Sequence, residues 1–354
     1  MVIEKTEKMD RRGFIKVSGA AAAGFALTGC APKGGSETPD EGPLVKEWAR
    51  FPERITRDVP PFDPLNIKEV TIEIGLEKPF DVMHVSDTHI ARADARDNER
   101  KIMLAAQRGQ HMNAGEHYLD EAVHIAREKG MYLMHTGDLH DFVSEANLDM
   151  DAKHMIEGDW FVCAGNHEYS QYVGEAKEDE AYKRVSYDAV QGAFPNDLTF
   201  ANRVINGVNF VAVDDVYYNF TEAQLEKMKA EMAKGLPVVM LVHVPLYTPA
   251  FYEDEMKGMD NKCAYLVGVP EELTETYEPG VTYPPGEEWR YRKVQQHSDE
   301  PTLKFVAWLK EQPLLKAILC GHMHRFFEER FSPTAMQYVV GATYLGDAQV
   351  VHFK

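Results

Sequence analysis

Residues 319–327 read LCGHMHRFF, and this stretch decides the fold. The apolar run over residues 317–320 is typical of a buried strand, and it stops at Gly321. Two histidines follow with a single residue between them, His322 and His324. Imidazole nitrogens bind metal ions and carry protons, so this pair indicates a chemical site at the end of a strand.

Four other apolar runs end in the same way, in side chains that bind metals or transfer protons. These side chains are Asp87 and His89 in MHVSDTHI, Asp138 and Asp141 in YLMHTGDLHD, Asn166 and His167 in FVCAGNHE, and His243 in VVMLVHVP. In open α/β sheets, ligands bind in the crevice outside the carboxyl ends of the strands. The five runs therefore predict that these side chains meet at one edge of the fold.

The spacing within two of the motifs has a physical reason. In an extended chain, residues i and i+2 point the same way. We therefore expect Asp87 and His89 to share one ion, and His322 and His324 to face the same small site. A glycine precedes three of the motifs and permits a sharp turn and a close approach of the backbone to an ion. These glycines are Gly137, Gly165 and Gly321.

The candidate ligands all offer nitrogen or oxygen. They are Asp87, His89, Asp138, Asn166, His243, His322 and His324. Such a set is too large for one transition metal ion but suits two ions that share a carboxylate, and Mn, Fe and Zn all accept these donors. Two divalent ions outweigh the charge of the two aspartates, so we expect an anionic substrate.

Apolar runs alternate with helical segments, which predicts an α/β fold. The expected strands cover residues 80–86, 131–136, 160–164, 208–214, 238–243 and 317–320, and the expected helices cover 114–130, 221–235 and 301–313. Thr221 with Gln224 three residues later predicts a capping box, and Gly130 predicts a helix end. Cys163 and Cys320 lie in apolar runs and are interpreted as small core residues.

In this order, the motifs resemble the signature of the calcineurin-like metallophosphoesterases over about residues 80 to 345. The resemblance rests on Asp87-Thr88-His89, on residues 137–141 and 165–168, on His243, and on residues 321–324. It implies an α/β fold in which a sandwich of two mixed sheets is flanked by helices. It also implies a centre of two divalent or trivalent metal ions (Mn, Fe or Zn) at the strand ends.

The resemblance also implies a role for each residue. Asp87, His89 and His324 would hold one ion; Asn166, His243 and His322 would hold the other; and Asp138 would bridge them. A hydroxide between the ions would then attack the phosphorus of a small phosphorylated substrate. His167 would stabilise charge or protonate the leaving oxygen, and Asp141 would fix the tautomer of His167. His140 is interpreted as a surface or supporting residue, and Glu168 as a support for its loop.

Two departures from related enzymes concern the second motif. Purple acid phosphatases carry a tyrosine near the position of Asp141, so we expect no iron–tyrosinate colour. The Arg-Gly pair that follows this motif in the Ser/Thr protein phosphatases is also missing, because Phe142 and Val143 stand there.

The first thirty residues are interpreted as an export signal. Arg11 and Arg12 precede an apolar stretch over residues 17–28, which is too short to span a bilayer. The pair resembles a Tat signal, and LTGC resembles a bacterial lipobox that would lipidate Cys30. Residues 31–45 are interpreted as a flexible linker, and 46–354 as the metallophosphoesterase domain. We therefore expect an exported lipoprotein on the extracytoplasmic face of the cell membrane.

Two polar stretches, 91–113 and 248–300, have no clear period and are interpreted as insertions. The second contains Arg290 and Arg292 next to aromatic residues and is interpreted as a substrate cap, with a solvated flap as the alternative.

The formal net charge of −19 argues against a nucleic-acid partner, because phosphate backbones are bound by basic surfaces. A nuclease of the same fold and a catalytically silent metal- or phosphate-binding lipoprotein are the alternatives to a phosphoesterase. The choice between monoester and diester substrates, and the oligomeric state, stay open.

Overall fold

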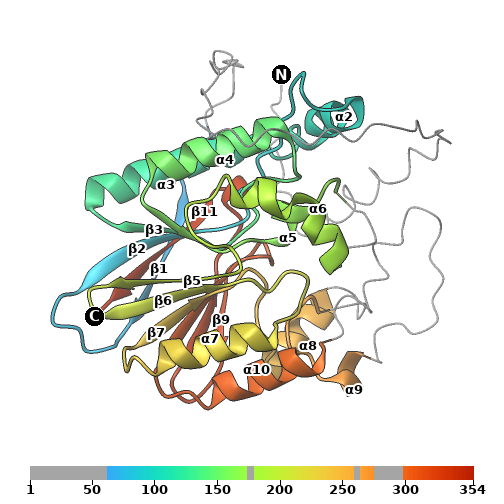
Figure 1. Cartoon of the computed structure of the whole chain (residues 1–354). Coiled ribbons are helices and arrows are strands. Elements are labelled where there is room, and N and C mark those ends of the chain that lie inside the picture. Colours follow the sequence, from blue (N-terminus) through green and yellow to red (C-terminus); the bar gives the residue numbers. More distant parts are fainter. Residues whose placement is uncertain (1–61, 174–178, 259–263, 275–297) are drawn as a thin grey trace, which may run out of the picture.

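The computed structural model describes residues 62–173, 179–258, 264–274 and 298–354. Two β-sheets lie face to face, and helices cover the outer face of each (Figure 1). The expected fold, a sandwich of two mixed sheets flanked by helices, is confirmed. Cys30, Arg290, Arg292 and the predicted signal and linker lie outside the described residues.

The first sheet has the strand order β1-β11-β2-β3-β4. Its strands are β1 (Asn66–Ile72), β2 (Phe80–Val85), β3 (Tyr132–His135), β4 (Trp160–Val162) and β11 (Asp347–Phe353). β2, β3 and β4 run parallel to one another, while β11 pairs with β2 in the antiparallel direction. The carboxyl ends of β2, β3 and β4 therefore lie at one edge, and the first three motifs follow them.

The second sheet has the strand order β5-β6-β7-β8-β10-β9. Its strands are β5 (Phe200–Ile205), β6 (Val208–Val213), β7 (Val238–Leu241), β8 (Leu315–Cys320), β9 (Phe327–Arg330) and β10 (Met336–Val339). The four middle strands, β6, β7, β8 and β10, are parallel. His243 follows β7, and His322 with His324 follows β8, so the second sheet brings its histidines to the same edge of the sandwich.

The period of two along the strands divides the apolar side chains between two cores. Val82 and Phe210 belong to the core between the sheets, where Phe80 stacks on Phe353 with ring centroids 4.9 Å apart. Their neighbours Met83 and Val211 belong to the larger core beneath the helices. Burial on both faces explains why these strands appear in the sequence as mostly apolar runs and not as an alternation of apolar and polar residues.

The three expected helices begin within one residue of the predicted start, but the second and third end three residues earlier than the sequence predicts. α3 (Gly115–Lys129) packs on β2 and β3 and stops at Gly130, whose φ of 66° is left-handed. α7 (Glu222–Met232) packs on β6 and has the capping box of Thr221 and Gln224. α10 (Glu300–Lys310) packs on α7. Figure 1 shows α3 and α4 (Glu145–Glu157) over the first sheet, and α7 and α10 over the second.

The stretch 91–113, interpreted as an uneven insertion, contains the helix α2 (Glu99–Arg108). The remaining described helices are α5 (Asn166–Tyr169), α6 (Glu180–Gln191), α8 (Pro249–Gly258) and α9 (Glu271–Thr274), with a 3-10 turn at Thr343–Leu345. Cys163 and Cys320 are buried, as the sequence suggests, and both are free thiols. Among the described residues, no helix has the length and apolar character needed to span a bilayer.

Candidate metal centre

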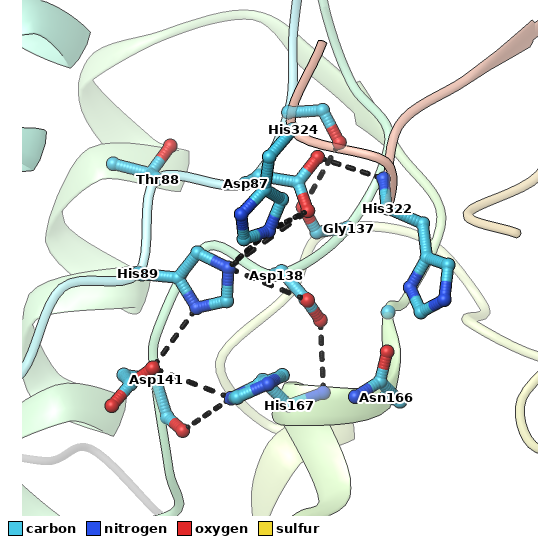
Figure 2. Close-up of polar contacts among 12 residues, drawn as sticks. Asp87, Thr88, His89, Gly137, Asp138, Asp141, Asn166, His167, His322 and His324 are labelled. Atoms are coloured by element: carbon cyan, nitrogen blue, oxygen red, sulfur yellow. Dashed lines mark hydrogen bonds and ion pairs between the residues drawn. The ribbon is translucent and has the colours of Figure 1, made fainter. Parts of the chain in front are cut away.

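The edge where both sheets end carries the predicted ligands in two groups. One group is Asp87, His89 and His324, and the other contains Asp138, His243 and His322. In each group, one ligand atom from every residue lies within 4.8 Å of the others. Figure 2 shows Asp138 between the two groups, with His89 and His324 on one side and His322 on the other.

In the first group, the ring nitrogens converge on one carboxylate oxygen. His324 Nε2 lies 3.2 Å from Asp87 Oδ1, and His89 Nε2 lies 3.8 Å from it. The two Nε2 atoms are 3.1 Å apart. In the second group, His243 Nε2 lies 3.2 Å from His322 Nδ1 and 3.3 Å from Asp138 Oδ2.

Both aspartates use one oxygen for the backbone and turn the other to the histidines. Asp87 Oδ2 accepts a hydrogen bond from the backbone N–H of His322 at 2.9 Å, and Asp138 Oδ1 accepts one from His167 at 2.8 Å. Asp138 Oδ2 is then 3.6 Å from His89 Nε2 and 3.3 Å from His243 Nε2. A single oxygen of Asp138 therefore faces both groups.

The ligands reach the site from turns and not from extended chain, so the predicted reason for their convergence is wrong. Asp87 and His89 have φ values of 54° and 50°, and His322 and His324 have values of 67° and 52°. Asp138 is also left-handed, with φ of 58°. Left-handed conformations of residues other than glycine are strained and cluster at functional sites. The concentration of such residues here marks the site independently of its chemistry.

Two of the predicted glycines are required because the backbone lies against another motif. A Cβ atom on Gly321 would lie 1.9 Å from Ser86 Oγ and 2.4 Å from Asp87 Oδ2. Gly137 has φ of 93°, and a Cβ there would lie 2.6 Å from His243 Nδ1. Each glycine therefore lets the end of one strand approach a proposed ligand that follows another strand. The approach is so close that any side chain at these positions would collide with that ligand.

In both groups, the ring nitrogen of each histidine that points away from the site has a hydrogen-bond partner outside the proposed ligands. His89 Nδ1 donates to Asp141 Oδ1 at 3.0 Å, and His243 Nδ1 donates to the Thr136 carbonyl at 2.7 Å. Two tyrosine hydroxyls support the other pair. Tyr218 Oη lies 3.2 Å from His322 Nε2, and Tyr344 Oη lies 3.3 Å from His324 Nδ1. Such outer partners fix the tautomer and orientation of a metal-binding histidine.

Burial and charge set different protonation states for His89 and His243. Burial lowers the pKa of His89 to about 4, although the hydrogen bond to Asp141 acts in the opposite direction, so the ring is neutral at neutral pH. Burial also acts to lower the pKa of His243, but the carboxylates of Asp138, Asp87 and Asp215 together outweigh it and raise that pKa to about 10. An ion that binds His243 must therefore displace a proton, which makes metal affinity depend on pH.

The residues present fit metal ions. Asp87 Oδ1 and Asn166 Oδ1 are buried and make no hydrogen bond, although buried carboxylate and amide oxygens are ordinarily satisfied. Donors at a metal–nitrogen distance of about 2.0–2.1 Å lie ~3.3 Å apart in tetrahedral geometry, close to the separations within both groups. Asn166, at the start of α5, faces the site on the side of Asp138 where His322 lies (Figure 2).

His167 and Asp141 lie directly beside the first group. The rings of His167 and His89 are perpendicular, with centroids 4.6 Å apart. His167 Nδ1 donates to the Asp141 backbone carbonyl at 2.7 Å, and Asp141 Oδ1 is 3.4 Å from the same nitrogen. Burial acts to lower the pKa of His167, but the carboxylates of Asp138 and Asp141 raise it to about 9.

The side chain of Asp141 is held by a residue that the sequence analysis missed. Arg108 is fully buried and donates from Nε to Asp141 Oδ2 at 2.5 Å and from Nη2 to Asp141 Oδ1 at 2.7 Å. Burial acts to raise the pKa of Asp141, but the guanidinium of Arg108 holds it well below its usual range. His89, Asp141 and His167 also form a compact group of possible ligands, but Arg108 already occupies that carboxylate.

Two further residues support the loops of the site. Glu168 accepts hydrogen bonds from the backbone N–H groups of Asp138, Leu139 and Gly165 at 2.7, 2.6 and 2.5 Å, which agrees with its interpretation as a loop support. His140 is fully buried and not at the surface. Its Nδ1 lies 2.5 Å from Asp151 Oδ2, and its Nε2 lies 3.2 Å from the Glu168 carbonyl.

The described part of the 248–300 stretch touches the site at two points. The rings of Tyr265 and His322 have centroids 6.2 Å apart, and Tyr265 is left-handed with φ of 53°. Arg325, which follows His324, donates from Nη2 to Glu255 Oε1 in α8 at 2.7 Å. These contacts tie the beginning of the stretch to the His322–His324 turn.

Comparison with known proteins identifies a family. The family model described as calcineurin-like phosphoesterase matches residues 80–326. A dimetal phosphatase from Danio rerio is 14% identical, with 75% of this chain and 88% of that chain covered and a TM-score of 0.41. A phosphopantetheinyl hydrolase from Mycobacterium tuberculosis is 12% identical, with 75% and 90% covered and a TM-score of 0.34.

A putative 5'-nucleotidase from Staphylococcus aureus, in complex with alpha-ketoglutarate, is 12% identical, with 75% of this chain covered and a TM-score of 0.38. This chain spans about half of that protein, 49% of its length. The comparison with curated proteins found no match.

Proposed function

Because the chain belongs to the calcineurin-like phosphoesterase family, we propose that it hydrolyses a phosphomonoester or phosphodiester at a centre of two metal ions. Asp87, His89 and His324 would hold one ion. Asn166, His243 and His322 would hold the other, with Asp138 shared between them. When bound, such ions supply a nucleophile at neutral pH and positive charge beside the phosphoryl group.

One observation carries the proposal of two ions. Asp138 Oδ2 lies within 3.6 Å of a histidine nitrogen from each group, while Asp138 Oδ1 is held by a backbone N–H. A carboxylate oxygen that faces two separate sets of nitrogen ligands suits a bridge between two ions, because a single ion would need only one of the sets.

In this proposal, His167 handles the proton of the reaction. Its Nδ1 is held by the Asp141 carbonyl, which leaves Nε2 to exchange a proton with the departing oxygen or to stabilise charge on the phosphoryl group. Asp141 keeps the ring in that orientation through its backbone oxygen. Except for the half-buried His322, the proposed ligands are buried, and low exposure to water strengthens each electrostatic interaction.

We further propose that the 248–300 stretch serves as a substrate cap. Its described beginning is tied to the His322–His324 turn through Arg325 and Tyr265, which supports a place near the site. Arg290 and Arg292, which lie outside the described residues, would contact the part of the substrate beyond the scissile phosphate. Binding energy from such remote groups can be used to discriminate between substrates.

The test of the proposed activity is a product-release screen of the purified protein. Phosphomonoesters and phosphodiesters would be supplied with Mn, Fe or Zn in turn after removal of bound metal by a chelator. We expect release with at least one ester class, restored only by metal. Metal binding without turnover of any ester would favour a catalytically silent binding protein instead.

We also propose that the protein is exported by the Tat route and anchored to the membrane through Cys30. The support is the order of Arg11-Arg12, the apolar stretch and the LTGC motif in the sequence. Cys30→Ser should release the protein from the membrane fraction, and replacing Arg11 and Arg12 with lysine should block export. A processed Cys30→Ser variant that stays membrane-bound would contradict the lipid anchor.

A further inference from the structure

Arg108 is a fully buried arginine that the metal ligands do not explain. It is the last residue of α2, and its side chain reaches a carboxylate 33 positions away in the chain. Burial of a guanidinium is costly and persists where paired hydrogen bonds compensate it. Docking of a surface helix alone does not explain why the guanidinium of Arg108 is buried.

The contact between Arg108 and Asp141 fixes the plane of the carboxylate. Arg108 donates from Nε to one oxygen at 2.5 Å and from Nη2 to the other at 2.7 Å. A two-point contact between planar groups defines orientation, which a single hydrogen bond does not.

The fixed carboxylate in turn orients a metal ligand. Asp141 Oδ1 accepts the hydrogen bond from His89 Nδ1 at 3.0 Å, so the opposite nitrogen, His89 Nε2, points toward Asp87 and His324. The chain of contacts from Arg108 to His89 therefore runs into the first ligand group.

In the second group, two hydrogen bonds support the histidines, and neither involves Arg108 or Asp141. Its histidines are supported by the Thr136 carbonyl and the Tyr218 hydroxyl, at 2.7 and 3.2 Å. Neither contact passes through α2.

We propose that Arg108 is a positioning residue for the first metal ion: by clamping Asp141, it aims His89 at the ligand point shared with Asp87 and His324. The inference rests on the proposed function, because it presumes two ions. It predicts that loss of Arg108 lowers the affinity of the protein for one ion and leaves its affinity for the other unchanged.

A merely structural role makes a different prediction. Leu104, one turn earlier on α2, packs with Phe142 and Val173, so α2 is also held by apolar contacts. If Arg108 served only to dock α2, its loss would lower the stability of the metal-free protein and affect both ions alike.

The experiment measures metal binding by calorimetry and elemental analysis on purified protein. Arg108→Gln should lower the affinity for one ion by about 10–100-fold, which is the usual effect of losing a partner of a metal ligand. The affinity for the other ion should not change. Arg108→Lys, which keeps the charge but not the two-point contact, should be intermediate. Arg100→Gln removes the same charge from an exposed position of α2 and should leave both affinities unchanged.

Two backgrounds identify the affected ion. In a His322→Ala background the first group remains complete, so adding Arg108→Gln should lower the affinity for the ion that still binds. In a His324→Ala background the first group is broken, so adding Arg108→Gln should leave the affinity for the ion that still binds unchanged. Equal losses in the two backgrounds, or none in either, would overturn the inference.

Folding is checked separately by thermal unfolding of each metal-free protein. If Arg108→Gln does not fold, Arg108→Gln with Asp141→Asn removes both buried charges and should still lose affinity only in the first group. Full affinity at both sites in that variant would also overturn the inference. Fewer than two ions in the wild type would instead contradict the proposed function.

Discussion

The two ligand groups face the same aspartate, but they are supported in different ways. In the first group, His89 depends on Asp141 and Arg108, a buried ion pair whose guanidinium comes from the separate helix α2. In the second group, His243 depends on the carbonyl of Thr136, which directly follows β3. His89 is therefore held by side-chain charge, and His243 by the backbone at the end of the sheet.

The difference teaches which parts of the centre follow from the fold. Thr136 follows β3 in the first sheet and His243 follows β7 in the second, so the packing of the two sheets already brings His243 to its support. The first group needs, in addition, a helix outside the sandwich and a guanidinium in one orientation. We therefore expect the second group to tolerate substitution around it better than the first.

The most severe way to break the comparison is to remove the residue that both groups share. Asp138→Ala should abolish the binding of both ions and all activity, because Asp138 Oδ2 faces a histidine from each group at 3.6 and 3.3 Å. Elemental analysis together with the ester assay measures both. Asp159→Ala, at an exposed surface carboxylate, is the control and should keep metals and activity. One ion retained in Asp138→Ala would mean that the groups are independent.

A smaller effect is expected from the loss of His167, which should lower the reaction rate without removing the metal ions. His167→Ala should retain both ions and lower kcat by about 10²–10⁴-fold, the range for a general acid or charge-stabilising group. His167 contacts Asp141 and Asp138 through hydrogen bonds and belongs to neither proposed ligand set.

The matched control for His167 is His124→Ala, at an exposed histidine of α3. It should change neither metal content nor rate. Loss of the metals in His167→Ala would show that His167 is part of the ligand set, and the proposed role would be wrong.

The positions of the proposed ligands could be predicted from the sequence because each lies within a few residues of a strand end. A continuous apolar run announces the strand, and the turn after it carries the polar residue. Their supports could not be predicted in this way. Arg108 is 33 positions from Asp141, and Tyr218 is 104 positions from His322. Arg108 ends a polar helix and has the sequence context of any exposed arginine, so only the tertiary structure reveals its partner.

The strands that could be predicted are those that form mostly apolar runs, such as β6 and β7, and they include the edge strand β4. The strands that the sequence did not reveal are β1, β5, β9, β10 and β11. β1, which reads NIKEVTI, and β9, which reads FEER, are edge strands with charged exposed residues. Charge on an edge strand protects against aggregation but removes the apolar signal by which a strand is found.

The pH dependence of stability tests His84, which contacts Thr136, the residue that supports His243 in the second group. His84 Nε2 lies 2.8 Å from the hydroxyl of Thr136, and burial lowers the pKa of His84 to about 4, with a hydrogen bond to Gln349 acting against it. The unfolded chain takes up this proton near pH 6.5, whereas the folded chain resists it down to about pH 4. The stability that His84 contributes is therefore present above pH 6.5 and is lost as the pH falls toward 4.

Denaturant unfolding of the metal-free protein at pH 7 and 4.5 measures this loss. His84→Gln should reduce the decrease in unfolding free energy on acidification by up to about 3 kcal/mol, since one pKa unit corresponds to about 1.4 kcal/mol. His124→Gln should follow the wild type. Equal pH dependence in all three proteins would show that His84 is not the group that acid titrates.

The smallest and sharpest test compares two matched tyrosines. Tyr218 Oη lies 3.2 Å from His322 Nε2 in the second group, and Tyr344 Oη lies 3.3 Å from His324 Nδ1 in the first. Tyr→Phe removes only the hydroxyl and leaves a histidine nitrogen without that partner. The expected loss of affinity is about 10-fold, at the low end for a partner of a metal ligand, because a neutral hydrogen bond is weaker than a charged one.

The two variants should differ in which ion they weaken. Tyr218→Phe should lower the affinity of the ion held by the second group, and Tyr344→Phe that of the ion held by the first, as calorimetric titration of each metal-free protein would measure. Because Arg108 and Asp141 still hold His89 in Tyr344→Phe, the first group should lose less there than in Arg108→Gln. If Tyr344→Phe cost as much as Arg108→Gln, side-chain charge would not be what distinguishes the first group, and the contrast between the two groups would fail.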